Sequence, residues 1–497
     1  MGVSTVTAAR ILDGQNNGRP GEENVLSFEE FDNVALSKTY NVDFMTPDSA
    51  GTATAMLCGV KTNVATLGLD GRAVYSDCAA SENAGQLDSL LHWAQAAGKR
   101  TGIVTTARVT HATPAAAYAK TPNRDWEGDT EMTKDDAPCK DIARQLIEDN
   151  PDINVILGGG RKFFLPDSKA DPETNSVDPA QRQDGRDLIE EWENDKKSRG
   201  KKHKYVWNRD DFMKVTDKSE FLLGLFEPSH MNFDLLRTDS GPSGEPSLVE
   251  MVEKAIDILE EADNGFVLVV EGARIDHGHH GNLPKLSLYD TLAFDKAVKV
   301  ARRNTELKDT LMIVTADHSH TFTISGYPTR GANILADHSH TFAISGYPNR
   351  CANILGKFCT QYNFVTADHS HTFTIAGYPN RCANILGLVD RGNAALDGKP
   401  RTILQYSNGP GYAEPRADLT GVDTTATGFM FSSGVPLPTE THAGEDVAIY
   451  ASGPMSHLIN GVKEQSYIAH VMAYASCLGP YSSGNKLRKC MTGRKKV

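Results

Sequence analysis

Four clusters of reactive side chains in this chain could together bind metal ions and attack an anion. The first is Asp48-Ser49-Ala50-Gly51-Thr52, in which a serine precedes a run of small residues. Such a run predicts a helix that begins beneath the serine, so that its free N–H groups and its dipole face a bound anion. Taken alone, the pattern equally fits a serine that merely caps a helix, and it becomes informative only with the other three clusters.

The other three clusters are rich in carboxylates and imidazoles. They are Glu271–His280 (EGARIDHGHH), Ala316–His320 (ADHSH) and Thr441–Asp446 (THAGED). Imidazoles and carboxylates in groups of three, with one position left open, are the ligands of a catalytic zinc ion, and hard oxygens suit magnesium. Each histidine taken alone is more often a capping, surface or core residue. As a set, together with Ser49, they indicate a nucleophile assisted by metal ions.

Short apolar runs that alternate with helical patterns predict a doubly wound α/β fold, with a mostly parallel central sheet and helices on both faces. The expected strands are Thr101–Thr105, Ile153–Leu157, Phe266–Val270 and Leu311–Val314. Helical stripes are expected at Leu87–Ala94 and Leu248–Leu259, the latter with Pro246 in its first turn. Glu271 and Asp317 each follow an expected strand, which is where ligands of such folds gather.

The composition limits the partners of the chain. The net charge of −13 over 497 residues argues against nucleic acid and against an anionic membrane surface. No apolar run reaches the length of a membrane span, the first residues show no signal peptide, and the basic C-terminal end lacks a lipid-anchor tail. The eight cysteines form no CxxC pairs and do not indicate a zinc–thiolate site. We expect most of the charged segment Asp167–Lys204 to be a solvated peripheral segment.

A segment that contains one of the clusters is present in three nearly identical copies. They are Ala316–Leu335, Ala336–Leu355 and Ala367–Leu386. Their unequal spacing argues against a solenoid, and one site can use only one Asp-His pair. We expect the first copy to be used, with Asp317 and His318, because it follows an apolar strand. The third copy, with Asp368 and His369, is the alternative because it runs directly into the downstream chain.

Ten stretches make the chain resemble the alkaline phosphatases of animals over nearly its whole length. They are Pro47–Asn63, Gly102–Ala119, Asn123–Trp126, Asp152–Lys162, Tyr205–Arg209, Gly224–Pro228, Val270–His280, Thr315–His320, Asn408–Tyr412 and Thr441–Val447. So many matches in the same order make coincidence negligible. The resemblance implies one domain over residues 1–497, with residues 336–386 as a duplicated insert. It also implies that residues 388–440 form a crown-like insertion at the interface of a homodimer.

The resemblance further implies hydrolysis of phosphate monoesters at alkaline pH through a phosphoserine intermediate. Ser49 would be the nucleophile, and Arg124 would hold two phosphate oxygens in its planar fork. The implied metal ligands are Asp276, His280 and His442 for one zinc ion, Asp317, His318 and Ser49 for a second zinc ion, and Glu271 and Thr113 for one magnesium ion. His111 and His320 would contact and orient these ligands without binding the metal ions themselves.

A calcium site and a disulfide are also implied by the resemblance. The calcium ligands would be Glu191, the carbonyl of Phe226, Glu227 and Glu245, although Glu245 stands where the family has an aspartate at another spacing. Cys78 and Cys139 would form a disulfide, and Cys477 with Cys490 a second one. Such bonds imply an oxidising environment, and thus a secreted, extracellular or cell-surface protein.

The chain departs from the family pattern at its first residue. Family members have a strand followed by Gly-Asp-Gly-Met-Gly, and that aspartate is shared by the second zinc ion and the magnesium ion. The sequence starts at Met1, just after this position. We therefore expect weak magnesium binding, a weakened second zinc site and strongly reduced activity. The alternative function is a catalytically impaired protein that binds metal or phosphate. A related phosphodiesterase or sulfatase is disfavoured by Arg124 beside an intact Ser49 motif.

Overall fold

The computed structural model describes residues 1–133, 136, 139–216, 218–237, 244–324, 384–389, 395 and 397–482. The alternative pair Asp368 and His369, the candidate half-cystine Cys490 and nearly all of the duplicated insert 336–386 lie outside these residues.

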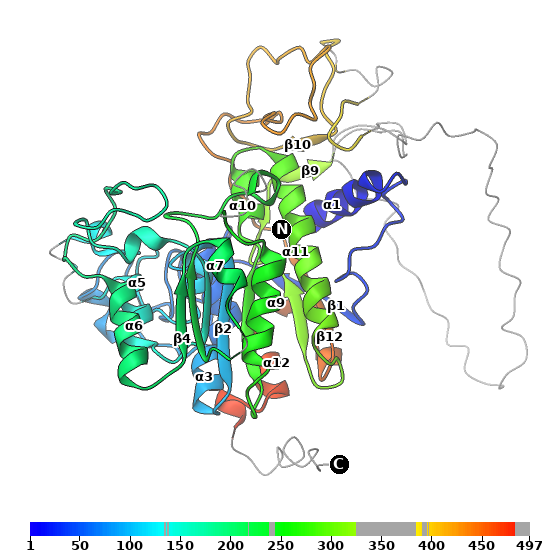
Figure 1. Cartoon of the computed structure of the whole chain (residues 1–497). Helices are drawn as coiled ribbons and strands as arrows, with labels where there is room; N and C mark the ends of the chain where they lie inside the picture. Colours follow the sequence, from blue (N-terminus) through cyan, green and yellow to red (C-terminus); the bar gives the residue numbers. More distant parts are fainter. Residues whose placement is uncertain are drawn as a thin grey trace, which may run out of the picture.

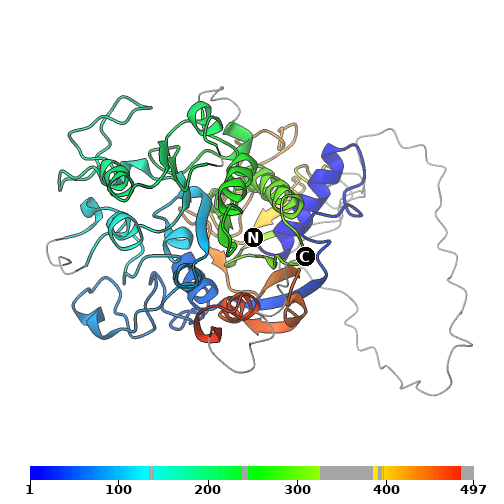
Figure 2. The same ribbon diagram turned by 60° about the horizontal axis from the view of Figure 1, so that its bottom comes forward.

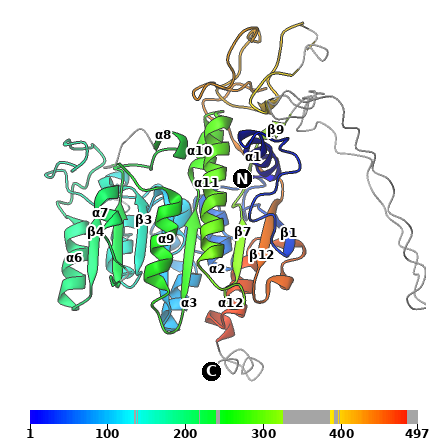
Figure 3. The same cartoon turned by 45° about the vertical axis from the view of Figure 1, so that its right-hand side comes forward.

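Two sheets form the centre of the molecule (Figures 1 and 3). The first has five parallel strands in the order β4-β5-β3-β2-β6. They are β2 (Arg100–Arg108), β3 (Val155–Gly159), β4 (His203–Val206), β5 (Phe221–Leu225) and β6 (Phe266–Glu271). The second is mixed, in the order β13-β1-β12-β7. Its strands are β1 (Asn33–Lys38), β7 (Met312–Thr315), β12 (Val447–Ser452) and β13 (Gly461–Glu464).

The α/β class and the four expected strands are confirmed as β2, β3, β6 and β7. The strands form two separate sheets rather than one, which the apolar runs do not predict. Within the described residues, β6 pairs only with β2, and β7 pairs only with β12. A cavity of about 680 Å³ lies between the facing edges of β6 and β7 and reaches Ser49, Glu271 and Asp317.

Helices cover both faces of the parallel sheet, as predicted. Successive residues of a strand point to opposite faces. Accordingly, Ile103 and Ile156 belong to the buried cluster that includes Leu91, whereas Val104 and Leu157 belong to the cluster of Met251. The helices that supply these faces are α2 (Ser49–Cys58), α3 (Leu90–Ala96), α9 (Leu248–Leu259), α11 (Pro284–Arg303) and α12 (Tyr467–Ala475). Figure 2 shows them on the two sides of the strands.

Serine residues cap both expected helices, and α9 begins at Leu248, where its apolar stripe also begins. Ser247 caps α9 and exchanges hydrogen bonds with Glu250, so Pro246 precedes the helix. Ser89 caps α3, which leaves Leu87 outside it. The remaining elements are α1 (Val3–Asn16), α4 (Ala112–Ala115), α5 (Ile142–Arg144), α6 (Leu188–Ser198), α7 (Arg209–Met213), α8 (Asp234–Arg237), α10 (Arg274–His280), β8 (Ser319–His320), β9 (Phe322–Ile324), β10 (Leu404–Tyr406) and β11 (His442–Ala443).

Most residues of the charged segment Asp167–Lys204 are exposed, as expected, but two of its cationic side chains are buried. Arg182 and Lys196 are fully buried. Arg182 forms ion pairs with Asp141 and Asp184, and Lys196 donates a hydrogen bond to the carbonyl of Pro151 at 2.7 Å. Buried charges of this kind are tolerated because each has a partner. The two buried side chains are therefore part of the core that carries α6.

Three further features concern the periphery. Within residues 397–440 of the expected insertion, β10 pairs with β9, and loops project beyond it at the top of Figure 1.

A disulfide joins Cys78 and Cys139, the pair that the resemblance implies. In the described part of the chain, no helix combines the length and the apolar character needed to cross a bilayer.

Candidate metal centre and nucleophile

Ser49 is the first residue of α2, but it does not cap the helix. The cap is Asp48, whose Oδ1 accepts a hydrogen bond from the N–H of Gly51 at 3.1 Å. Gly51 has no room for a side chain, because a Cβ would lie 2.6 Å from Oδ1 of Asn41. The Ser49 hydroxyl is thus free to face the site at the positive end of the helix.

Ser49 lies beside the Asp-His pair of the first repeat copy. Ser49 Oγ is 3.1 Å from Nε2 of His318, and this nitrogen is 3.2 Å from Oδ2 of Asp317. Burial lowers the pKa of His318 to about 3, so its ring is neutral. Its Nδ1–H donates to the carbonyl of Ser319 at 3.1 Å, which leaves a lone pair on Nε2. A lone pair that faces a carboxylate oxygen fits a cation bound between them.

A second group has the spacing of a zinc site. Nε2 of His280 and Nε2 of His442 are 3.1 Å apart, and each lies 3.4 Å from Oδ1 of Asp276. The Nδ1–H groups of both rings donate to the carbonyls of Glu440 and Pro47, so both Nε2 atoms present lone pairs to each other. Tetrahedral zinc ligands lie about 3.3 Å apart. The repulsion of the two lone pairs would be relieved by a cation between them.

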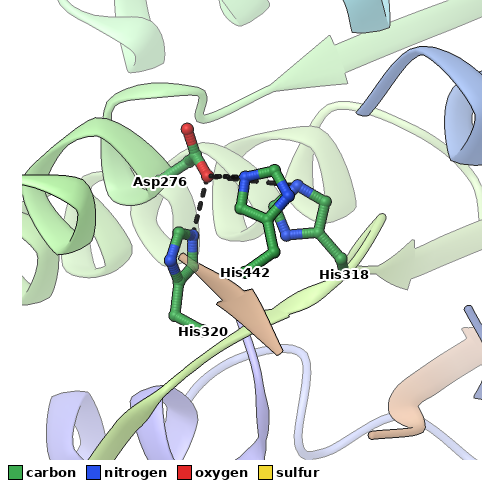
Figure 4. Close-up of side chains that lie close together, drawn as sticks. All are labelled: Asp276, His318, His320 and His442. Atoms are coloured by element: carbon green, nitrogen blue, oxygen red, sulfur yellow. Dashed lines mark hydrogen bonds and ion pairs between the residues drawn. The ribbon is translucent and has the colours of Figure 1, made fainter. Parts of the chain in front are cut away.

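His320 contacts two carboxylates, and Figure 4 shows the first of these contacts, with Asp276. Its Nε2 is 2.7 Å from Oδ1 of Asp276, and its Nδ1 is 2.7 Å from Oε2 of Glu440. Burial lowers the pKa of His320, but the two carboxylates outweigh burial and raise it to about 9. In the β8–β11 pair, His320 stands opposite His442, so two distant segments meet here. The sequence analysis missed Glu440, whose one signal is its position two residues before His442.

Oxygen ligands gather at the end of the cavity between the two sheets. The hydroxyls of Thr105 and Thr113 donate hydrogen bonds to Glu271, the former at 2.5 Å. Burial raises the pKa of Glu271 to about 7. Glu271, Thr113 and Asp317 all line the cavity. Oxygen ligands of this kind suit Mg²⁺.

Arg124 is held at the edge of the site by two partners. Its Nη1 donates to Oδ2 of Asp48 and its Nη2 to Nε2 of His111, both at 3.1 Å. Burial raises the pKa of Asp48, but the Arg124 charge and the N–H donors of the backbone outweigh burial and hold it below its usual value. Because Asp48 directly precedes Ser49 in the chain, its ion pair with Arg124 holds the guanidinium near Ser49.

The residues expected to bind calcium are only partly brought together. Asn232 donates from its side chain to Glu227 at 3.1 Å and from its backbone N–H to Glu245 at 2.8 Å, and Phe226 is buried beside them. Burial and neighbouring carboxylates raise the pKa of Glu227 to about 8. The structure places Glu191 elsewhere, because its carboxylate is bound by Arg186.

Glu173 is the acid that lies near this pair of carboxylates in place of Glu191. Its charge contributes to the raised pKa values of both Glu227 and Glu245. One oxygen of Glu245, Oε2, is buried and has no hydrogen-bond partner in the described structure. A cation held by three carboxylates would satisfy it.

Sequence comparison identifies the class of protein that this site belongs to. A family model of alkaline phosphatase matches residues 1–337 and 360–478. The chain is 44% identical over 488 residues to the tissue-nonspecific alkaline phosphatase of Gallus gallus, covering 97% of this chain and 83% of that protein. It is 44% identical over 487 residues to an alkaline phosphatase of Gadus morhua, covering 96% and 90%. The chain therefore belongs to the alkaline phosphatase family of phosphoric monoester hydrolases.

Solved structures support the fold. The alkaline phosphatase of the Antarctic bacterium TAB5 aligns with a TM-score of 0.57 at 20% identity, covering 96% of this chain and 95% of that one. The enzyme of Thermus thermophilus aligns with a TM-score of 0.59 at 22% identity, covering 96% and 89%. A variant of the TAB5 enzyme was solved with Mg bound in a site called M3.

Proposed function

We propose that this chain hydrolyses phosphate monoesters at alkaline pH through a phosphoseryl intermediate on Ser49. The observation that carries the proposal is the position of Ser49 Oγ at the start of α2, 3.1 Å from a neutral His318 and next to the guanidinium of Arg124. A serine hydroxyl is a weak nucleophile, and it needs both activation and a partner that holds the phosphoryl group.

The donor set supports two zinc ions and one magnesium ion at this centre. Asp276, His280 and His442 would hold one zinc ion, and Asp317, His318 and Ser49 the other. Glu271 and Thr113 would bind magnesium. When bound, these ions supply positive charge that stabilises the serine alkoxide and the leaving oxygen. The lone pairs of His280 and His442, which face each other at 3.1 Å, support this assignment.

Side chains and backbone groups of the protein would bind the phosphoryl group and carry out the attack on phosphorus. Arg124 would bind two oxygens of the phosphoryl group in its planar fork, and Asp48 keeps that fork oriented. Ser49 would attack phosphorus in line with the leaving group: the Oγ–P bond forms as the bond from phosphorus to the ester oxygen breaks, the Ser49 proton passes to solvent, and the departing oxygen takes up a proton to leave as the alcohol. Water would then break the Oγ–P bond, which releases phosphate and restores the Ser49 hydroxyl. The free N–H groups at the start of α2 would stabilise the charge on the phosphoryl oxygens.

Hydrolysis of p-nitrophenyl phosphate by the full chain with Zn²⁺ and Mg²⁺ at alkaline pH tests the proposal. Ser49→Ala should lower kcat by about 10³-fold or more, because the covalent step is lost. Ser198→Ala, at the exposed end of α6, is the matched control and should retain the rate. Equal rates for Ser49→Ala and the parent chain would refute the role of Ser49.

The same preparation also tests the alternative function, in which the protein binds metal or phosphate but does not hydrolyse phosphate monoesters. If the parent chain releases no p-nitrophenol, binding of inorganic phosphate is measured by calorimetry. Phosphate binding that Arg124→Ala abolishes would establish the alternative, because a phosphate site would then exist without catalysis.

Three further properties are proposed from family membership. Residues 388–440 would form the interface of a homodimer, and Glu173, Phe226, Glu227 and Glu245 would bind calcium. The Cys78–Cys139 disulfide supports a secreted or cell-surface location, because such bonds persist in oxidising compartments.

A further inference from the structure

A run of basic residues lies where α6 ends and β4 begins (Figure 1). Residues 196–204 read KKSRGKKHK, which places six lysine or arginine side chains in nine positions without a single acid. The chain as a whole is acidic, with a net charge of −13. At physiological ionic strength, exposed charges more than about 8 Å apart are largely screened from each other. A ligand at this turn would therefore interact with the basic run rather than with the net charge of the chain.

The fold accounts for three of the six cations. Lys196 is fully buried. Arg199 forms an ion pair with Asp152, and Nζ of Lys201 lies 3.4 Å from a carboxylate oxygen of Glu220. These three side chains have partners within the folded chain, so they are explained without a ligand.

The other three cations have no such explanation. Lys197, Lys202 and Lys204 are exposed, and none of them forms an ion pair with an acid in the part of the chain that the structure describes. Lys197 lies in the last turn of α6. Lys202 directly precedes β4, which is an edge strand of the parallel sheet, and Lys204 lies two positions further along, on the same side of the extended chain. All three ammonium groups are thus available to an anion in solution.

The backbone that carries these lysines is fixed by contacts of its own. The N–H of Lys201 donates to the carbonyl of Lys196 at 2.9 Å, which closes the turn at the end of α6. The ring of His203 lies edge-on against Trp192 of α6, with the ring centres 5.7 Å apart. Because the main chain is already ordered, a ligand would have to immobilise only the lysine side chains, which lowers the entropic cost of binding.

We propose that this turn binds a sulfated glycosaminoglycan, with Lys197, Lys202 and Lys204 in contact with its sulfate groups. Short runs rich in lysine and arginine are typical of sites for polyanions such as heparin and nucleic acid. The proposed secreted or cell-surface location, on which this choice rests, favours the polysaccharide over nucleic acid. The run contains no apolar side chain that could enter a lipid bilayer, so it does not favour a membrane surface.

Binding of a fluorescent heparin oligosaccharide to the full chain, followed by anisotropy over a range of salt concentrations, tests the site. We expect the parent to bind and its affinity to fall as salt rises. The triple variant Lys197→Gln/Lys202→Gln/Lys204→Gln should bind about tenfold more weakly or worse at physiological salt. The slope of log affinity against log salt should be smaller by about three, one for each cation removed. Equal thermal melting would show that the variant is folded.

A matched variant controls for the loss of charge alone. Lys296→Gln/Lys299→Gln/Lys308→Gln removes the same charge from exposed positions on α11 and after it, and it should bind heparin like the parent. Equal affinity of the parent and the first triple variant for heparin would overturn the proposal.

Two further probes test the choice of ligand. Desulfated heparin should not compete with the labelled oligosaccharide. A DNA oligomer of equal charge that binds as tightly as heparin would show a site for nucleic acid or for polyanions in general, and would overturn the assignment to a glycosaminoglycan. None of these measurements uses turnover, so their outcome does not depend on the proposed role of Ser49.

Discussion

Glu440 holds the His320 ring from the side opposite to Asp276, and its substitution should loosen the metal centre. Its side chain is 1% exposed, and it also accepts hydrogen bonds from the N–H and hydroxyl of Thr321, both at 2.6 Å. Glu440→Gln keeps an oxygen for Thr321 but removes the charged acceptor from His320. Supporting partners of this kind are worth about 10–100-fold in metal affinity or activity. We expect losses of that size in bound zinc at fixed free zinc and in kcat/KM.

Glu445→Gln is the matched control for this substitution, because Glu445 is an exposed acid a few residues further along the same segment. It should leave both quantities unchanged. Zinc content and kcat/KM that do not differ between Glu440→Gln and the parent would show that Asp276 is fixed without Glu440.

At the residue scale, the sequence predicted the groups that are reactive by type. Ser49, Asp276 and Asp317 stand in motifs whose chemistry can be recognised, and the structure brings them to one place. Single acids carry no such pattern, so Glu440 was missed. Glu191 was expected as a calcium ligand and Glu173 was not considered, since only the folded structure shows that Arg186 binds Glu191 and that Glu173 lies near Glu227.

At the scale of elements, α11 contains a buried acid that should make stability depend on pH. Asp290 is 4% exposed, and its Oδ2 accepts the N–H of Asp234 at 3.1 Å. Burial raises the pKa of Asp290 from 3.8 to about 8. The folded chain therefore retains a proton that the unfolded chain has lost. Between these two values, the free energy of unfolding should fall by about 1.4 kcal/mol per pH unit as the pH rises.

Asp290→Asn should remove this dependence, because the amide still accepts the hydrogen bond but cannot ionise. Urea unfolding midpoints at pH 6 and pH 8 should differ less in Asp290→Asn than in the parent. Asp309→Asn, at an exposed position after α11, serves as the control and should behave like the parent. An unchanged difference between the two pH values in Asp290→Asn would show that another group carries the dependence.

Helices and strands could be predicted where a single local sequence pattern determines them. Four apolar runs predicted β2, β3, β6 and β7, since strands buried on both faces must be apolar throughout. The start of α9 at Leu248 was predicted by its apolar stripe, whereas α3 begins at Leu90 because the capping hydrogen bonds of Ser89 leave Leu87 outside the helix. The buried Arg182 and Lys196 of the largely exposed segment Asp167–Lys204 were not predicted, because local charge cannot show which ionic groups find partners in the core.

At the scale of the whole molecule, the division between the two sheets depends on long-range pairing that no local pattern specifies. The apolar run of β6 is that of a strand with neighbours on both sides. In the described structure, however, β6 and β7 each have one paired edge, and the cavity of about 680 Å³ lies between their other edges. Glu271 and Asp317, which we propose as metal ligands, line this cavity.

The two open edges should be visible in hydrogen exchange of the full chain. In a strand paired on one side, about half of the amides point away from the partner, and those amides lack the hydrogen bond that slows exchange. Peptides that cover β6 and β7 should therefore take up deuterium earlier than peptides that cover β2 and β3, whose neighbours lie on both sides. Mass spectrometry at a fixed pH measures this difference, and β2 and β3 are the internal controls with both edges paired. Equal protection of all four strands would mean that in solution another segment pairs with the facing edges of β6 and β7, which would also bring its side chains to the end where Glu271 and Asp317 lie.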